Sequence, residues 1–575
     1  MINLSTVDIT IFILFVLTVI TIGLAKSRDE KDSESYFLAG RGLQWWLIGF
    51  SLIAANISTE QFVGMSGQAA DYVGLAIASY EWMAAITLVV VAFFFLPKFL
   101  RSGVYTAPEF LRVRFNDQAR LIMAVFTMIM YVGVTISAVI YSGALTLSTL
   151  FPGVGLTIAA WIIGLIAAVY VVSGGLKAVA WADLIQGSAL ILAGGLILVL
   201  VLRMLGDTPV DELTYTAAVS GVADDASGWT KLMELNSDKL HMVLPSWDLV
   251  LPWTALVVGL WIPNFYYWGL NQYIIQRTLG AHSLAEGQKG TVFAAGLKLL
   301  IPFVIVLPGI AAFNLFSDEM AAEAARDPQI AQGNQRAWER FEQIQQDPFA
   351  PPVIFDFDQA YAEANPSRAQ ALEAFNAEVR EEAGRDVEHV RLVGYKYDTA
   401  LPLLIGRVVP TGVGLQGFIL AALLGAVVSS LASMLNAAST IFTMDLWKRY
   451  IKPESSELGL VLTGRTTVAI FAAIGCLVAP LLGDPKFGGI FTFIQEFQGF
   501  ISPGILAVFL FGFFVPRANR WAGAIGLLTC PVVFGGLKVA LPSLAFLDRM
   551  AVAFFIVLAI LTAMTLISPK KEPDE

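Results

Sequence analysis

Charged side chains occur inside stretches of the sequence that are otherwise apolar. Glu81 and Asp183 each stand near the start of such a stretch, and Lys298 lies well inside the run FAAGLKLLIPF. A lone charge at the centre of a bilayer costs about 3 kcal/mol on insertion scales, so such residues usually face a cavity or a partner and mark a pathway. We interpret these three residues as candidates for a transport site, with a structural ion pair or an interfacial position as the alternative.

Hydroxyl and amide groups extend this set. Ser429 and Ser430 are adjacent in AVVSSLASMLN, a segment whose small residues by themselves favour close helix packing. Two neighbouring hydroxyls that face carbonyls freed by an unwound helix would also supply the all-oxygen shell that a hard cation such as sodium requires. Gln495 in FIQEFQGF is either an interhelical fastener or a substrate contact. The sequence alone does not decide between a packing role and a binding role, either for the serine pair or for Gln495.

Together these side chains favour a neutral, hydroxyl-rich solute. Amide, carboxylate and ammonium groups donate and accept many hydrogen bonds with little net charge, and tyrosine and tryptophan faces suit the apolar face of a ring. A sugar or another polyol therefore fits better than an amino acid or a phosphate, because the sequence has no glycine-rich phosphate loop. We also find no arginine deep inside the apolar stretches, which argues against a carboxylate.

The elements that must position these residues are membrane spans. Hydrophobic residues make up 57% of the chain and charged residues only 14%, whereas soluble domains are about a quarter charged. Stretches of about 20 apolar residues cross the hydrocarbon core as helices. We predict an all-α polytopic membrane protein with thirteen spans, near residues 7–25, 43–67, 78–96, 121–151, 155–172, 184–205, 250–275, 288–316, 410–444, 461–482, 487–514, 521–540 and 546–567.

Two of these spans contain groups that lipid does not tolerate. Asn56 and Ser58 lie at mid-depth in the span 43–67, and Pro263 and Asn264 lie inside the span 250–275. Unwound backbone at this depth survives only where protein or a water-filled cavity surrounds it, and transporters use such breaks to bind ions and substrates. Because the two interrupted spans are five apart, we predict two five-helix units related by an inverted repeat.

Basic residues in the short loops predict the orientation. Lysine and arginine gather after the first, third and ninth spans and are absent after the second and fourth, which places the N-terminus outside and the C-terminus in the cytoplasm. The first span lacks the basic n-region of a signal peptide, so we expect it to be retained. The segment 317–398, with 17 acidic and 8 basic residues, would then lie outside. We expect two amphipathic helices in it, near 335–346 and 367–383, with Ser367 as the N-cap of the second.

Composition excludes several other classes. Cys476 and Cys530 both lie in apolar runs, which leaves no disulfide framework and no cysteine-based metal site. No basic stripe suggests nucleic acid. We expect an N-terminal extra helix and loop (1–42), a first repeat (43–205), an outer loop (206–249), a second repeat (250–316 and 399–514) that surrounds the acidic insert (317–398), and two C-terminal helices with a tail (515–575).

Seven motifs carry a resemblance to a known family. They are SLIAANIS, ASYEWM, NFYYWGLNQYIIQRTL, FAAGLKL, AVVSSLASMLN, FIQEFQG and SPGILAVF. These stretches resemble the sodium/solute symporter family, in particular its bacterial sodium/galactose and animal sodium/glucose branches. The resemblance implies a LeuT-like 5+5 core and no enzyme activity. It implies that the protein carries sodium and a neutral sugar into the cell by alternating access, across a plasma membrane of the bacterial inner-membrane kind.

The resemblance also implies roles for individual residues. Sodium would be held by the backbone carbonyls of Ala54, Ile57 and Ala426 and by the hydroxyls of Ser429 and Ser430. The sugar would be hydrogen-bonded by Gln61, Glu81, Asn264, Lys298 and Gln495, with Asn56 in support. Tyr267 would stack under the sugar ring as the inner gate, and Met65, Tyr80 and Phe491 would close the site from outside. Asp183 would lie on the route by which sodium leaves.

Three departures from the family pattern bear on these roles. Ala84 replaces a serine of the galactose transporter, which leaves the preferred sugar open. Ala432, followed by Ser433, stands where relatives with a second sodium carry a hydroxyl, so we expect one sodium per sugar. The insert 317–398 has no counterpart of similar size, and we expect a structured loop over the outer vestibule and not an enzyme domain. Inositol or another polyol as the solute, or an uncoupled sugar sensor or facilitator, remain as alternatives.

Overall fold

The computed structural model describes residues 4–26, 32–57, 59–150, 153–219, 221–347, 349–384, 387–483, 490–541 and 544–567. The described chain is predominantly helical, and ten of its helices are long and apolar enough to cross a membrane. The predicted all-α polytopic class is therefore confirmed. The count of thirteen is not confirmed by this measure, because the expected spans 43–67, 155–172 and 250–275 consist of short or interrupted helices.

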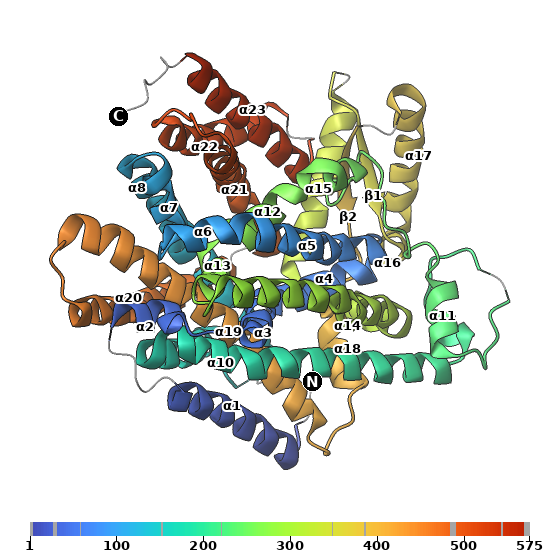
Figure 1. Ribbon diagram of the computed structural model, residues 1–575. Coiled ribbons are helices and arrows are strands. Elements are labelled where there is room, and N and C mark those ends of the chain that lie inside the picture. The colour runs from blue at the N-terminus through green and yellow to red at the C-terminus, as the bar shows by residue number, and fades with distance from the viewer. Residues whose placement is uncertain are drawn as a thin grey trace.

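The helices and the two strands follow one another in the chain as shown in Figure 1. Their bounds are α1 (Thr6–Lys26), α2 (Ser33–Leu38), α3 (Trp45–Asn56), α4 (Thr59–Ala70), α5 (Ser79–Val90), α6 (Leu96–Ser102), α7 (Ala107–Arg114), α8 (Asp117–Met128), α9 (Ile136–Leu150), α10 (Leu156–Asp207), α11 (Gly228–Leu235), α12 (Trp261–Leu270), α13 (Gln272–Leu279), α14 (Leu284–Ala325), α15 (Pro328–Gln346), β1 (Val353–Phe357), α16 (Gln359–Ala364), α17 (Pro366–Ala383), β2 (Glu388–Leu392), α18 (Ala400–Arg407), α19 (Leu415–Ile441), α20 (Glu457–Val478), α21 (Ile490–Phe514), α22 (Ala522–Ala540) and α23 (Phe546–Ile567).

The first predicted break is present. Helix α3 ends at Asn56, Ile57 is extended with φ −81° and ψ 97°, and α4 begins at Thr59. Ser58 lies outside the described residues. The last turn of any helix leaves carbonyl groups without a helical donor, so the break presents carbonyls of α3 to whatever packs beside them.

The second break lies elsewhere than Pro263 and Asn264 indicate. Both residues are inside α12, and the chain turns extended at Asn271, between α12 and α13, with φ −75° and ψ 120°. Pro263 is the third residue of α12. The backbone is already helical before α12, through the π-helical turn Ala255–Gly259 and Leu260, and it continues past Pro263 with the Asn264 N–H bonded to the Leu260 carbonyl, so the proline does not break the chain here.

The fifth and sixth expected spans form one helix with a kink. Within α10, Gly174 and Gly175 leave the helical region, and Gly175 has φ +47°. A Cβ atom at Gly175 would come within 2.1 Å of the backbone oxygen of Tyr36. Only glycine fits this close approach, and the kink separates the two halves of α10 where the sequence analysis expects a loop.

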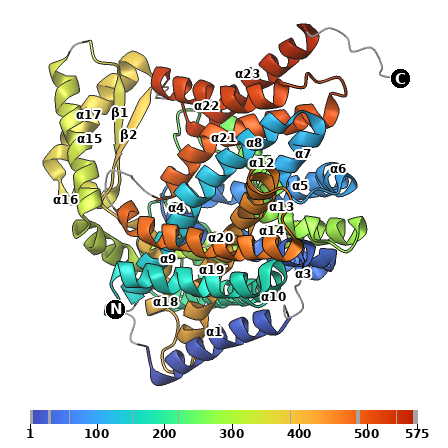
Figure 2. The same ribbon diagram turned by 90° about the vertical axis from the view of Figure 1, so that its left-hand side faces the viewer.

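Helix α19 lies at the centre of the bundle. Almost all of its residues are buried, and it contacts α1, α3, α9, α10 and α20. Helix α1 lies on one side, against α10 and α19, and the pair α22 and α23 packs with α21 on the opposite side (Figures 1 and 2). The small residues of α19 allow its neighbours to approach closely.

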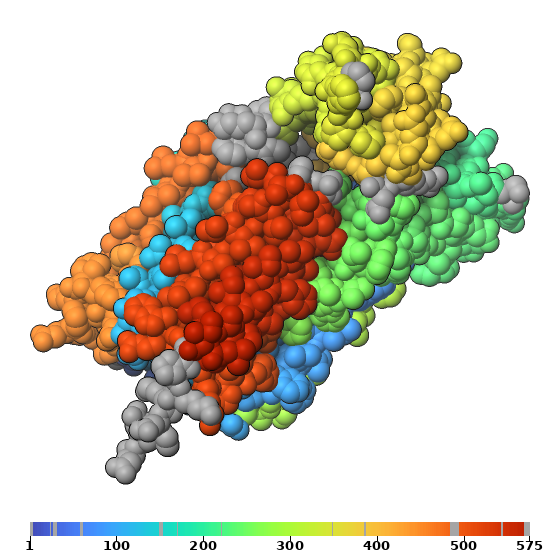
Figure 3. All heavy atoms as spheres, turned by 90° about the horizontal axis from the view of Figure 1, so that it is seen from above, coloured from blue at the N-terminus to red at the C-terminus, as the bar shows by residue number. Residues whose placement is uncertain are grey.

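The insert 317–398 is a structured lobe that projects from the helical body (Figure 3). Strands β1 and β2 pair in parallel from Val353↔Glu388 to Phe357↔Leu392, and an apolar core centred on Phe341, Phe355 and Leu372 lies between the sheet and its helices. Both predicted helices are present as α15 and α17. Ser367 is not the N-cap: α17 begins one residue earlier, at Pro366, after Asn365. The parallel strands are an addition to the predicted elements.

Candidate functional site

Lys298 of α14 is the centre of a buried polar cluster. Its side chain is fully buried, and its ammonium group donates hydrogen bonds to Oδ1 of Asn56 and to Oε2 of Glu81. The ring of Trp268 lies 5.0 Å from the Lys298 nitrogen, within the range of a cation–π contact. Lys298 and Glu81 are 217 positions apart in the sequence, and α3, α5 and α14 bring these groups together.

Gln61 completes this cluster. It lies in the first turn of α4, directly after the break, and its amide donates to Oε1 of Glu81. Both oxygens of the Glu81 carboxylate are therefore hydrogen-bonded, one to an ammonium group and one to an amide. Opposite charges that neutralise each other can be buried where one alone cannot. We call Asn56, Gln61, Glu81 and Lys298 the polar cluster.

Tyrosine hydroxyls connect the polar cluster to the second break. The Asn56 amide donates to the hydroxyl of Tyr267 at 3.0 Å, and the hydroxyl of Tyr273 donates to the same oxygen. Tyr131 in turn donates to the side chain of Asn271, the extended residue of the break. Of the three tyrosines and Asn271, only Tyr267 was predicted from the sequence to belong to the site. The polar pair Asn271–Gln272 at the end of GLNQY is the signal that could have located this break.

The other residues that were predicted to bind the sugar or to form the gates are Asn264, Gln495, Met65, Tyr80 and Phe491. Asn264 donates to the Leu260 carbonyl of the preceding turn at 2.9 Å. Gln495 is partly buried on α21. Met65 is buried on α4, and Tyr80 precedes Glu81 in the first turn of α5. The side chain of Phe491 lies outside the described part of the structure.

The serine pair on α19 faces the first break. The Ser430 hydroxyl donates to the backbone oxygen of Ala55 at 3.0 Å, and Ser429 donates to Oδ1 of Asp183 at 2.5 Å. Both serines are fully buried. Ala54 and Ile57, whose carbonyls are predicted to ligate sodium, flank this contact along the chain, and Ala426 lies one turn before Ser430 on α19. The contact of a hydroxyl with a carbonyl beside the unwound residue is the arrangement that the sequence analysis expects of an oxygen-based cation site.

Asp183 belongs to a buried network with Arg277 of α13. The guanidinium donates to Oδ2 of Asp183 at 2.8 Å and, through Nε, to the Ser51 hydroxyl at 2.6 Å. Ser51 donates to Asp183, and Arg277 also donates to Ser433. The sequence shows no arginine deep inside the expected spans, and Arg277 lies two residues beyond the span 250–275, after the break at Asn271. It is nevertheless buried, and its charge is neutralised by Asp183.

Glu496, the residue after Gln495 on α21, forms two ion pairs with neighbouring helices. Its carboxylate pairs with Lys538 of α22 at 2.9 Å and with Arg549 of α23 at 3.2 Å. Glu496 therefore fastens three helices together. Its neighbour Gln495 points from the same helix at an angle of about 100°, because helical residues are 3.6 to a turn.

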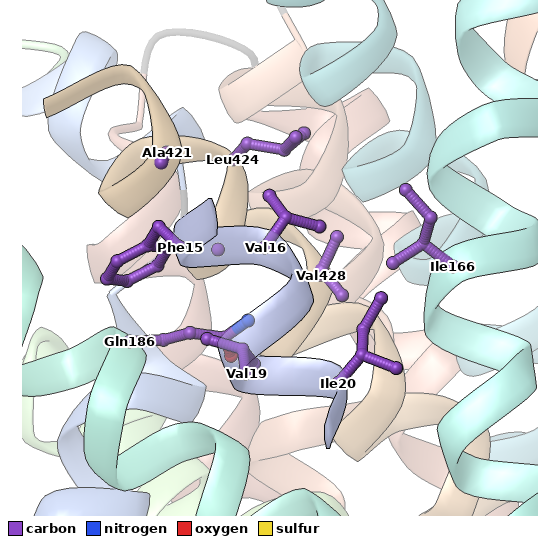
Figure 4. Close-up of a pocket in the computed structure, with 10 residues that line it drawn as sticks. Phe15, Val16, Val19, Ile20, Ile166, Gln186, Ala421, Leu424 and Val428 are labelled. Carbon is purple, nitrogen blue, oxygen red and sulfur yellow. The ribbon is translucent and has the colours of Figure 1, made fainter. Parts of the chain in front are cut away.

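A separate small apolar pocket lies between α1, α10 and α19 (Figure 4). Its wall is aliphatic and aromatic apart from Gln186 of α10, which lies one turn beyond Asp183. None of its lining residues belongs to the polar cluster. A cavity with one amide and no charged group does not suit a sugar, whose hydroxyls each need a partner.

The two centres meet at the break in α3. Ala55 contacts Ser430 through its carbonyl, and the next residue, Asn56, contacts Lys298 through its side chain. Buried hydroxyl and carbonyl oxygens and a set of hydrogen-bonding side chains thus meet at the C-terminal end of α3, directly before the extended residue Ile57.

Comparisons with known proteins point to one family. A sequence profile of the Sodium:solute symporter family matches residues 36–339 and 383–529, with a gap inside the insert. The sodium/glucose cotransporter of Vibrio parahaemolyticus is 40% identical over the whole chain and 92% of that relative. The sodium/myo-inositol cotransporter 2 of Bos taurus is 31% identical over 92% of the chain and 69% of that relative. A solved Na⁺-coupled sialic acid symporter shares the fold over the full length of both chains, with a TM-score of 0.74 at 20% identity.

Proposed function

Because the chain belongs to the sodium:solute symporter family, we propose that it carries a neutral sugar of the galactose or glucose kind into the cell together with sodium. It is a membrane transporter and not an enzyme. The observation that carries the proposal is the shared break in α3, where Ala55 contacts Ser430 and Asn56 contacts Lys298. The 40% identity to a sodium/glucose cotransporter supports the choice of a sugar.

The residue roles are part of this proposal. Sodium is held by the carbonyls of Ala54, Ile57 and Ala426 and the hydroxyls of Ser429 and Ser430. The sugar is held by Gln61, Glu81, Asn264, Lys298 and Gln495, with Asn56 in support. Tyr267 forms the inner gate, Met65, Tyr80 and Phe491 the outer gate, and Asp183 lies on the sodium exit.

Coupling follows from the shared backbone. Sodium between the end of α3 and α19 holds the segment 54–57 in one arrangement, and in that arrangement Asn56 orients Lys298 and Tyr267. The sugar exchanges the hydrogen bonds inside the polar cluster for bonds to its own hydroxyls. When α4 and the outer gate have closed, sodium leaves past Ser429 and Asp183, whose carboxylate oxygen is 2.5 Å from the serine hydroxyl.

The driving force sets an upper bound on accumulation. A tenfold sodium gradient supplies about 1.4 kcal/mol, and 100 mV adds about 2.3 kcal/mol for one charge. One sodium per sugar therefore supports an accumulation of roughly 500-fold. We propose this stoichiometry because Ala432 offers no second hydroxyl beside the serine pair and Ser433 already contacts Arg277.

We further propose an orientation with the N-terminus outside, the C-terminus in the cytoplasm and the insert outside, in the plasma membrane of the bacterial inner-membrane kind. The basic loops after α1, α6 and α19 support it. The division into repeats at 43–205 and at 250–316 with 399–514, flanked by 1–42 and 515–575, is part of the same proposal. Helix α10 forms the last two spans of the first repeat, joined at the glycine kink.

Uptake into proteoliposomes tests the function. Labelled galactose, glucose and myo-inositol are offered separately with an inward sodium gradient and, as the control, with sodium equal on both sides. We expect galactose or glucose to accumulate only under the gradient. Accumulation of myo-inositol alone would establish the polyol alternative, to which the 31% identical relative points. Equilibration of a sugar without accumulation would establish a facilitator.

A further inference from the structure

The insert is joined to the outer half of the broken helix by an ion pair. Arg391 of β2 binds Asp71 with both terminal nitrogens, one on each carboxylate oxygen. Asp71 directly follows α4, which ends at Ala70, and is buried. The guanidinium also lies over the ring of Tyr72, with 4.5 Å from its carbon to the ring centroid. A two-point arginine–carboxylate contact is stronger and more directional than a single ionic contact.

Other contacts anchor the same end of α4. Asp398, the last residue of the insert, packs so closely on Gly67 that a Cβ atom there would lie 2.7 Å from its carboxylate. Lys239 donates to the Ala70 carbonyl at 2.6 Å. Burial lowers the pKa of Lys239 to about 8, so it is a cation at neutral pH, and a cation is favourable at a helix C-terminus.

The N-terminal end of the insert is continuous with α14. Helix α14 runs on to Ala325, inside the insert, and the Lys396 backbone N–H donates to the Met320 carbonyl of that helix at 3.0 Å. The Lys396 ammonium pairs with Asp327 at 2.6 Å. The insert thus forms a bridge between two helices. Its N-terminal end continues α14, and its C-terminal part contacts the end of α4 through Arg391 and Asp398.

The bridge spans two helices that lie against each other. The backbone of Ser66 in α4 is so close to Gly309 in α14 that a Cβ atom at Gly309 would lie 2.4 Å from its oxygen. In this arrangement Met65 is buried and Gln61 contacts Glu81. Any movement of the outer half of α4 away from α14 therefore has to separate Asp71 from Arg391 as well.

We propose that Arg391 is a positioning residue for transport, which holds the outer half of α4 closed over the polar cluster through its contact with Asp71. The Asp71–Arg391 pair raises the free energy that is required for outward opening. Asp71 and Arg391 touch neither the proposed sugar contacts nor the proposed sodium ligands. Their removal shifts the population toward the outward-open state, because the pair stabilises the arrangement in which Met65 is buried.

Labelling of a cysteine at position 65 tests this inference without transport. In a Met65→Cys background, reaction with a membrane-impermeant maleimide reports on outward opening. The native cysteines 476 and 530 are both buried, and the chain without Met65→Cys supplies the background rate. We expect Arg391→Gln and Asp71→Asn each to raise the labelling rate at least threefold. Arg391→Lys, which keeps the charge but not the two-point contact, should give an intermediate rate.

A matched control is Arg340 of α15, whose partner lies on the same strand as Arg391. Arg340 pairs with Glu388 of β2 inside the insert, at 2.7 and 2.5 Å. Arg340→Gln removes an ion pair of the insert but leaves Asp71–Arg391 in place, so it should label at the rate of the parent. An equal acceleration in Arg340→Gln and Arg391→Gln would overturn the inference, and so would an unchanged rate in both Arg391→Gln and Asp71→Asn.

Kinetics provide a second readout, which rests on the proposed function. If outward opening becomes easier and closing harder, the KM for external sugar and the maximal uptake rate of Arg391→Gln both fall. A variant that is merely less well folded loses maximal rate at constant KM. Because labelling requires no sugar, a wrong sugar assignment would leave the labelling result intact and remove only the kinetic one.

Discussion

At the scale of single residues, substitutions of Lys298 and Glu81 distinguish an effect on folding from an effect on sugar binding. Loss of one partner of a buried ion pair leaves an uncompensated charge and costs about 3–5 kcal/mol, whereas replacement of both is often neutral. We expect Glu81→Gln and Lys298→Met each to lower the thermal stability of the detergent-solubilised protein strongly. The double variant should regain stability but not sugar uptake. A double variant that transports normally would show that the pair is structural only.

The serine pair carries a prediction about sodium alone. Ser430→Ala removes the hydroxyl beside the Ala55 carbonyl, and we expect the half-saturating sodium concentration for uptake to rise about tenfold, equal to about 1.4 kcal/mol of binding free energy. Ser439→Ala is the matched control, because Ser439 is also buried on α19 but donates to Asn436 of its own helix. A sodium dependence that stays unchanged in Ser430→Ala would contradict the assigned ion site.

Residue types were predictable from the sequence, and their partners were not. A lysine inside an apolar run is conspicuous because lipid does not tolerate it, and the same holds for Glu81. Arg277 was missed because it follows the polar residues of the break and looks like part of a loop. Tyr131 was missed because tyrosine is common in membrane helices, and nothing in its neighbourhood reveals that its hydroxyl faces Asn271.

At the scale of elements, the first break was predictable and the second was misplaced. Asn56 and Ser58 are polar groups that need partners at mid-depth, so they indicate where α3 has to end. A proline is expected to break a helix interior, but Pro263 follows the π-helical turn Ala255–Gly259 and the chain stays helical on both sides of it. This turn has no distinctive residue pattern, so the sequence does not reveal it.

The kink of α10 leads to a prediction about this long helix. Gly175→Ala places a methyl group against the Tyr36 carbonyl and requires a conformation that costs a non-glycine residue about 1–3 kcal/mol. We expect a marked loss of thermal stability and of folded protein. Gly195→Ala in the same helix meets nothing within 4 Å and should stay within about 1 kcal/mol of the parent. If Gly175→Ala and Gly195→Ala had the same thermal stability, the kink would not be needed for folding.

At the scale of the whole molecule, the structure separates a nearly neutral helical body from an acidic lobe. The sequence located that lobe by its charge and predicted both of its main helices. It did not reveal β1 and β2, because five-residue strands in a polar segment carry little periodicity and their parallel pairing joins segments 35 positions apart. The contact of Arg391 with Asp71 is equally invisible in the sequence, since it depends on how the lobe is placed on α4.

The charge of the lobe provides the last prediction. The exposed face of α17 carries Glu373, Glu378, Glu381 and Glu382, and replacement of all four by glutamine changes the net charge of the insert from −9 to −5. An acidic surface concentrates cations only within the screening length, about 30 Å at 0.01 M and about 8 Å at 0.15 M ionic strength. We expect the half-saturating sodium concentration of the fourfold variant to rise up to about twofold at low ionic strength.

The same measurement at 0.15 M ionic strength is the control. There the parent and the fourfold variant should have the same half-saturating sodium concentration, because α17 acts on sodium only through its long-range field. A difference that persists at 0.15 M would mean that these glutamates act through contacts, either on sodium itself or on the position of the insert. In that case the labelling rate at position 65 would separate the two, since only a displaced insert releases Asp71 from Arg391.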